Sequence, residues 1–196
     1  MTTRWQQHVE DMSNLLRGVS ARDREGRDLD VQAAFDQWCA WTLKLRDRHR
    51  TLYLVGNGAS ASMASHMAAD LAKNGHVHTQ VFSDLSLITA ISNDMGYEWV
   101  FAEPLARRAT EGDQLVAISS SGRSPNVLAA VKVARERGLT VVTLSAMAPD
   151  NPLRKAGDLN FHVAAQRYGY AESSHAIILH NYMDMVQAQT PAEDKR

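Results

Sequence analysis

The chain has 196 residues, of which 44% are hydrophobic and 22% are charged, a composition that predicts one globular unit with a sizeable core. Its formal net charge is −1 and its isoelectric point is about 6.7, so no overall basic field favours nucleic acid or an anionic membrane surface as a partner. Cys39 is the only cysteine, which excludes an intramolecular disulfide and a thiolate metal cluster. The first residues lack the apolar core of a signal peptide, and no window approaches the roughly 20 apolar residues of a membrane span, so we expect a cytoplasmic protein.

Two amphipathic helices are predicted at the start of the chain, over about 5–19 and 31–48, because apolar residues recur there at helical spacing. The stretch between them, 20–30, is charged and has no periodic pattern. The aromatic surface of the second helix has two interpretations: it packs on the core of its own domain, or it forms a subunit interface. With the second interpretation, residues 1–50 are a helical oligomerisation segment ahead of one globular domain at 51–190.

The remainder of the chain alternates between strand and helix patterns. Strands are expected at 52–55, 79–82, 114–118, 140–144 and 159–163, and helices at about 60–74, 85–93, 98–110, 124–137 and 172–188. This alternation predicts an α/β fold, a doubly wound and mainly parallel five-stranded sheet with helices on both faces. Ligands of such sheets bind outside the carboxyl ends of the strands.

Two serine-rich turns fall at that edge of the predicted sheet. The first, Gly56-Asn57-Gly58-Ala59-Ser60, follows the strand at 52–55, and the second, Ser119-Ser120-Ser121-Gly122-Arg123-Ser124, follows the strand at 114–118. Hydroxyls, glycine-freed backbone N–H groups and a helix N-terminus together favour a phosphate group. Neither turn has the lysine of a Walker loop or the glycine spacing of a dinucleotide fingerprint, so we expect a phosphorylated small molecule. Helix N-capping is the alternative role for Ser60 and Ser124.

Four side chains that can bind a metal or transfer protons lie on two of the predicted helices. His66 and Asp70 are four residues apart and project from one face of the helix after the first turn, although such pairs are also common as surface ion pairs. Glu172 and His180 lie on the last helix, roughly 80° apart around its axis. All four are of types that bind zinc or another divalent metal.

These motifs, together with Asn93-Asp94-Met95-Gly96 and the closing helix with His175 and His180, resemble the sugar isomerase (SIS) domain over about 52–186. Within that superfamily the chain looks like the sedoheptulose 7-phosphate isomerases, or phosphoheptose isomerases. The resemblance implies interconversion of sedoheptulose 7-phosphate with D-glycero-D-manno-heptose 7-phosphate on the way to activated heptose. It also implies a homotetramer formed through the N-terminal helices.

Carried over by motif, the resemblance assigns roles to individual residues. The phosphate would be bound by Ser119, Ser120, Ser121 and Ser124, and the rest of the substrate by Asn57, Gly58, Ser60, Asp94 and Glu172. A zinc ion would be held by His66, Asp70, Glu172 and His180. Asp70 would be the base at C1 and C2, and His180 would serve the neighbouring oxygen in a reaction through a cis-enediol.

Two departures from the family pattern leave alternatives open. Asp70 stands where the family has Glu, and Glu172 stands where it has Gln. These exchanges are compatible with an isomerase for another phosphosugar. A non-catalytic module that senses phosphosugars or binds a protein is a further alternative, against which the presence of two histidines and two carboxylates counts.

Overall fold

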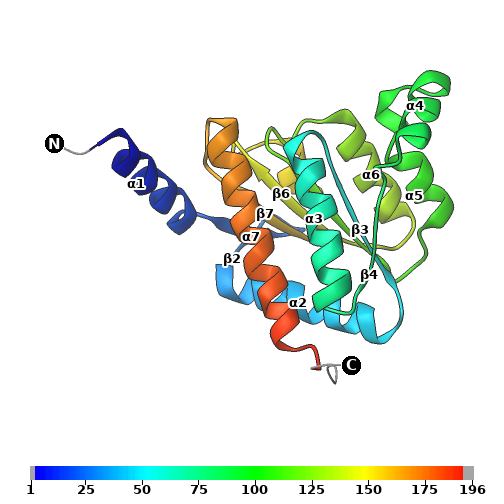
Figure 1. Cartoon of the computed structure of the whole chain (residues 1–196), viewed down its shortest axis with the longest axis horizontal. Helices are drawn as coiled ribbons and strands as arrows, with labels where there is room; N and C mark the ends of the chain where they lie inside the picture. Colours follow the sequence, from blue (N-terminus) through cyan, green and yellow to red (C-terminus); the bar gives the residue numbers. More distant parts are fainter. Residues whose placement is uncertain (1–2, 192–196) are drawn as a thin grey trace.

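The computed structural model describes residues 3–191, which form a mixed sheet covered by helices on both faces (Figure 1). The strands are β1 (Ser20–Asp23), β2 (Asp28–Leu29), β3 (Thr51–Gly56), β4 (His78–Val81), β5 (Gln114–Ser119), β6 (Thr140–Ala146) and β7 (Leu159–Val163). The helices are α1 (Arg4–Arg17), α2 (Val31–Asp47), α3 (Ala59–Asn74), α4 (Leu85–Asp94), α5 (Ala102–Arg108), α6 (Pro125–Glu136) and α7 (Tyr168–Ala188), with short 3₁₀ turns η1 (Tyr97–Trp99) and η2 (Pro152–Lys155). The strand order is β2-β1-β7-β6-β5-β3-β4.

The central strands confirm the predicted α/β fold, since β4, β3, β5, β6 and β7 pair in parallel in that order. All six residues of β5 are buried, because helices cover both faces of the sheet. The parallel arrangement brings the carboxyl ends of β3 and β5 to the same edge. The two serine-rich turns therefore lie side by side at that edge.

The sheet has seven strands and not the five that we predicted from the sequence. Part of the charged stretch 20–30 forms a hairpin, β1–β2, and β1 pairs antiparallel with β7 through Ala21 and Phe161. Only Ala21 of β1 is buried, so the segment shows no apolar alternation. The edge strand of the hairpin is β2, whose exposed Asp28 suits that position, because charge discourages pairing with other chains.

Two apolar cores lie on either side of the sheet. One is formed with α2, α3 and α7, and the other with α5, α6 and the end of α4. Trp38 of α2 is fully buried and stacks on Tyr182 of α7, with ring centroids 3.7 Å apart. The aromatic face of α2 therefore packs on the core of its own domain.

Helix α1 differs from the other long helices, because none of its residues is buried and it projects from the body of the molecule (Figure 1). Its first turn is closed by a capping box, in which Thr3 and Gln6 exchange hydrogen bonds. Among residues 3–191, none of the helices combines the length and the apolar character that crossing a bilayer requires.

Candidate functional site

The first serine-rich turn connects β3 to α3 through Gly58, whose φ of +55° suits glycine. The turn is tight, because a Cβ atom at Gly56 would lie 2.6 Å from the Cβ atom of Ser60. Ser60 is buried, and no side chain caps the N-terminus of α3. The capping role that was the alternative for Ser60 is therefore not seen.

The second turn connects β5 to α6 and brings two hydroxyls together, with Ser119 Oγ 3.0 Å from Ser124 Oγ. Ser124 lies at the N-cap position of α6, but its side chain makes no capping hydrogen bond. Ser120 is buried, and the Ser121 hydroxyl accepts a hydrogen bond from the backbone N–H of Arg123. The hydroxyls of Ser119 and Ser124 are thus held near each other, and Ser124 does not cap the helix.

A pair of side-chain amides joins the two turns. Asn57 Nδ2 donates to Asn126 Oδ1 at 2.9 Å, and Asn126 Nδ2 donates to Asn57 Oδ1 at 2.8 Å. The hydroxyl of Tyr97 donates to the same Asn57 oxygen at 3.1 Å. Asn126 is buried, so the pair fixes the distance between the turns.

A cavity of about 140 Å³ opens beside the first turn. Its polar side is formed by the turn, with Asn57 and Gly58, and by Ser65, Ser83 and Tyr97. Its apolar side comes from β3, β4 and the segment before α5. The cavity therefore offers hydrogen-bonding groups on one wall and an apolar surface on the other.

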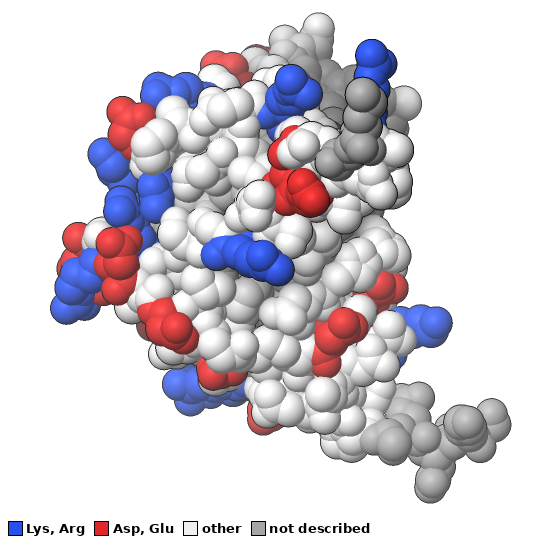
Figure 2. All heavy atoms as spheres, turned by 90° about the vertical axis from the view of Figure 1, so that its left-hand side faces the viewer, with Lys and Arg blue, Asp and Glu red and all other residues white. Residues whose placement is uncertain are grey.

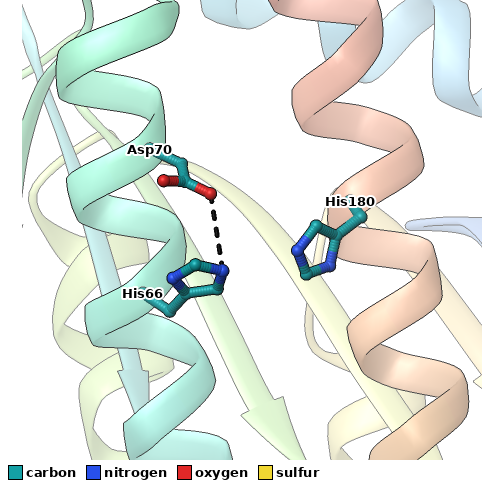
Figure 3. Close-up of side chains that lie close together, drawn as sticks. All are labelled: His66, Asp70 and His180. Atoms are coloured by element: carbon teal, nitrogen blue, oxygen red, sulfur yellow. Dashed lines mark ion pairs between the residues drawn. The ribbon is translucent and has the colours of Figure 1, made fainter.

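The groups with acid–base chemistry lie on the facing sides of α3 and α7 (Figure 3). His66 Nε2 is 3.4 Å from Asp70 Oδ2, and the rings of His66 and His180 have centroids 5.4 Å apart. One ligand atom from each of the three side chains lies within 4.8 Å of the other two. The structure therefore brings together three of the four residues that the sequence predicted for a metal.

The tautomer of His180 follows from its hydrogen bond. Its Nδ1 lies 2.9 Å from the carbonyl oxygen of Ala176, and a carbonyl oxygen can only accept, so Nδ1 carries a proton. Nε2 of the neutral ring then has a free lone pair, which can take a proton or bind a metal.

Two predicted site residues lie apart from this group. Glu172 precedes His180 by eight residues on α7, a rise of about 12 Å along the helix axis, and it is not among the side chains that come within 4.8 Å of one another. Asp94 ends α4 and lines a different cavity of about 290 Å³ between α4 and α5. In this structure neither carboxylate joins the cluster of His66, Asp70 and His180.

His175 has a different environment from His180, although both are on α7. It is fully buried, and burial lowers its pKa from 6.5 to about 4. A neutral, buried imidazole facing the sheet takes no part in the exposed cluster.

Comparison with known proteins identifies the family. The SIS domain model matches residues 32–146. A phosphoheptose isomerase from Bradyrhizobium sp. (strain BTAi1) is 39% identical over 136 residues, which cover 66% of this chain and 69% of that protein. The phosphoheptose isomerase of Campylobacter concisus is 35% identical over 156 residues, covering 76% of this chain and 80% of the relative. This chain belongs to the phosphoheptose isomerases of the SIS-domain family.

Solved structures agree with this assignment to the phosphoheptose isomerases. The structure of GmhA from Neisseria gonorrhoeae matches with a TM-score of 0.79 and 27% identity, covering 93% of this chain and 97% of that one. A phosphoheptose isomerase from Francisella tularensis matches with a TM-score of 0.80 at 20% identity, covering 94% of this chain and 95% of that one, and shows the shared fold.

Two residues that contact the first turn of this phosphoheptose isomerase were not predicted from the sequence. Asn126 follows the second turn by two residues and is the second residue of α6. A polar residue so close to the turn could have been predicted to lie at the site. Tyr97 has no such signal, because the chain between α4 and α5 brings it to Asn57 from 40 residues away.

Proposed function

We propose that this chain is an aldose–ketose isomerase that interconverts sedoheptulose 7-phosphate and D-glycero-D-manno-heptose 7-phosphate in heptose biosynthesis. One observation carries the proposal: a chain 35–39% identical to phosphoheptose isomerases holds ligand atoms of His66, Asp70 and His180 within 4.8 Å of one another. A carboxylate and an imidazole that lie so close supply the base and the acid of such a reaction. A module that only senses phosphosugars or binds a protein needs neither group.

The reaction needs two proton transfers in each half. Starting from the ketose, Asp70 takes a proton from C1 while protonated His180 donates a proton from Nε2 to the oxygen on C2, which gives a cis-enediol. Asp70 then returns its proton to C2, and His180 takes the proton from the oxygen on C1, so that the aldose forms. Both side chains end in their starting states, and proton transfer of this kind contributes about 10²–10⁴-fold to the rate.

The phosphate is bound in this proposal by the second serine-rich turn. Its four hydroxyls are those of Ser119, Ser120, Ser121 and Ser124, and the sugar is contacted by Asn57, Gly58, Ser60, Asp94 and Glu172. The 3.0 Å approach of the Ser119 and Ser124 hydroxyls supports convergence of donors on one anion. The amide pair of Asn57 and Asn126 supports joint action of both turns on a single substrate.

A zinc ion is the metal that we propose for the cluster. Two imidazoles and one carboxylate form a donor set that zinc accepts, so the side chains present fit such an ion. His66 and Asp70 would hold it, with Glu172 and His180 as the other predicted ligands; His180 Nε2 can bind the ion only when it does not carry the proton that the reaction transfers. When bound, the ion supplies Lewis-acid polarisation of the substrate carbonyl.

The active protein is, in this proposal, a cytoplasmic homotetramer. Exposed apolar side chains on α1, Trp5 and Val9, support an interface there. Figure 2 shows that uncharged surface covers much of the face from which α1 projects, with basic and acidic side chains lying within it. The single buried cysteine suits a reducing compartment.

An isomerase for a different phosphosugar is the second candidate, and the length of Asp70 favours it. A base that is one methylene shorter than Glu moves by about an ångström, which can cost on the order of 100-fold in rate with the same substrate. A sugar with its reacting carbon nearer α3 would restore the distance.

The test is to incubate the protein with sedoheptulose 7-phosphate and follow the aldose phosphate by NMR, before and after chelation and with Zn²⁺ restored. We expect turnover that chelation lowers and Zn²⁺ restores. If sedoheptulose 7-phosphate binds saturably but is not turned over, while another ketose phosphate is isomerised, the second sugar is the substrate. If phosphosugars bind but none is turned over, the proposal that the protein is an isomerase is wrong.

A further inference from the structure

A further cavity lies at the opposite edge of the sheet from the serine-rich turns. Its volume is about 210 Å³, and it lies between the C-terminal half of α2 and the first residues of β5 and β6. We call it the basal cavity, and its main lining residues are Trp41, Lys44, Arg48, Asp113, Gln114 and Thr140. Gln114 begins β5 and Ser119 ends it, so the two sites are separated by roughly 16 Å of strand.

The basal cavity has an excess of positive charge. Lys44 and Arg48 are one helical turn apart on α2, both are exposed, and within residues 3–191 neither makes an ion pair. Arg50 is close by and donates to Thr110 Oγ1. The cations of the cavity are thus not neutralised by the protein.

The single carboxylate among the lining residues is already occupied. Asp113 Oδ1 accepts from the backbone N–H of Thr51 at 2.9 Å, and Oδ2 accepts from the backbone N–H of Thr110 at 2.8 Å and from its hydroxyl at 3.2 Å. Asp113 therefore serves to join the loop ends at this edge of the sheet, and its oxygens are not directed to Lys44 or Arg48.

Gln114, which lines the basal cavity, has a buried side-chain donor without a partner in the part of the chain that the structure describes. Its side chain is 1% exposed, and its Oε1 accepts a hydrogen bond from Thr42 Oγ1 at 2.9 Å. Its Nε2 has no acceptor among the described residues. A buried donor without an acceptor is costly, and native structures provide partners for nearly all such groups.

We propose that the basal cavity binds a small anion, a carboxylate or phosphate group carried by a small metabolite. Lys44 and Arg48 neutralise its charge, and the amide of Gln114 donates to one of its oxygens. The indole of Trp41 forms an apolar wall for the rest of the molecule. The volume of about 210 Å³ is below the usual range for drug-sized ligands, which restricts the occupant to a small molecule.

A hydrogen-bonded chain joins the basal cavity to α7, the helix that also carries His180. Thr42, which donates to Gln114, has its hydroxyl 2.6 Å from the hydroxyl of Tyr182 on α7. Tyr182 follows His180 by two residues on the same helix. The hydrogen-bonded chain from Gln114 therefore ends on α7, on nearly the opposite face from His180, because two residues turn the side chain through about 200°.

The test is isothermal titration with inorganic phosphate and, separately, with benzoate. The protein for this titration carries Ser119→Ala and Ser121→Ala, so that the second serine-rich turn contributes little binding. We expect one saturable site per chain for at least one of the two anions. The anion that binds more tightly identifies whether phosphate or carboxylate is the natural group.

Variants at the basal cavity decide the assignment. Lys44→Ala/Arg48→Ala should weaken binding at least 10-fold, and Gln114→Glu should do the same, since it keeps the acceptor for Thr42 and replaces the donor. The matched control, Arg24→Ala/Lys132→Ala, removes two exposed cations elsewhere and should change affinity less than twofold. Absence of saturable binding for both anions, or equal affinity in Lys44→Ala/Arg48→Ala, would overturn the proposal.

Discussion

The proposed chemistry depends most on the carboxylate of Asp70. It lies 3.4 Å from the imidazole of His66 and is partly shielded, with 26% of its side chain exposed. Asp70→Asn keeps the shape and removes the base, so kcat should fall by about 10²–10⁴-fold. Aldose formation measured by NMR at saturating substrate checks this.

Asp70→Glu keeps the carboxylate but changes its position, so it distinguishes the need for a base from the need for its exact placement. If the substrate is sedoheptulose 7-phosphate, the longer carboxylate restores the family's arrangement, and kcat/KM should stay within about 100-fold of the parent or rise above it. An Asp70→Asn protein that retains full activity would show that another group removes the proton.

Asn126 provides a prediction about substrate binding. Asn126→Ala removes both amide hydrogen bonds to Asn57, so the two serine-rich turns lose their direct connection. We expect KM for the phosphosugar to rise about 10-fold or more, and the free energy of unfolding to fall by about 1–3 kcal/mol. Steady-state kinetics and denaturant unfolding measure the two effects, and an unchanged KM would show that the turns bind substrate independently.

At the scale of elements, α7 joins two histidines with opposite surroundings. His180 lies on the side of α7 that faces α3, whereas His175 is fully buried against the sheet. Helical geometry produces this difference, because five residues turn the side chain through about 140°. One helix thus carries the proposed acid on one face and a core residue on another.

Two buried histidines determine how the stability depends on pH: His175 on α7 and His162 in β7. Burial lowers the pKa of each from 6.5 to about 4 in the folded protein. Above pH 6.5 both rings are neutral in the folded and unfolded states, so they do not change the free energy of unfolding. Between pH 6.5 and 4 only the unfolded state takes up these protons, and the free energy of unfolding falls by about 1.4 kcal/mol per pH unit for each histidine.

Urea unfolding from pH 7.5 to 4.5 measures this dependence. His175→Leu should make the decline shallower, because the unfolded state then binds one proton fewer. His78→Gln, at an exposed position, serves as the control and should keep the parent slope. An unchanged slope in His175→Leu would mean that His175 is protonated in the folded state.

The main elements could be predicted from the sequence because their apolar patterns are strong. The five parallel strands and the long helices lie within a few residues of their expected bounds, and three of the four predicted ligands meet. The hairpin β1–β2 could not be predicted, since its pairing with β7 depends on a strand about 140 residues away. α7 begins at Tyr168 and not near residue 172, because Tyr170 stacks on His8 and donates to Asp11 of α1.

For the whole molecule, α1 raises the question of what covers it. It has 14 residues, none of them buried, and Trp5 and Val9 are 71% and 47% exposed on neighbouring turns. An isolated helix of this length is marginally stable in water, and most helices gain stability from an apolar contact. The contacts of α1 with its own chain are few and are made mainly with α7. A second copy of the chain is the partner that the proposed tetramer supplies.

Trp5→Ser/Val9→Ser tests this arrangement. The substitutions remove the exposed apolar side chains, so the tetramer that we expect for the parent should dissociate to smaller species. Sedimentation velocity at micromolar concentration measures the assembly, and Arg4→Ser/Glu10→Ser, on other faces of α1, is the matched control that should remain tetrameric. A parent protein that sediments as a monomer, or a double variant that remains tetrameric, would contradict the role of α1. Because α1 contacts α7 through Asp11 and Tyr170, loss of the tetramer should also lower kcat/KM if the interface supports the helix that carries His180.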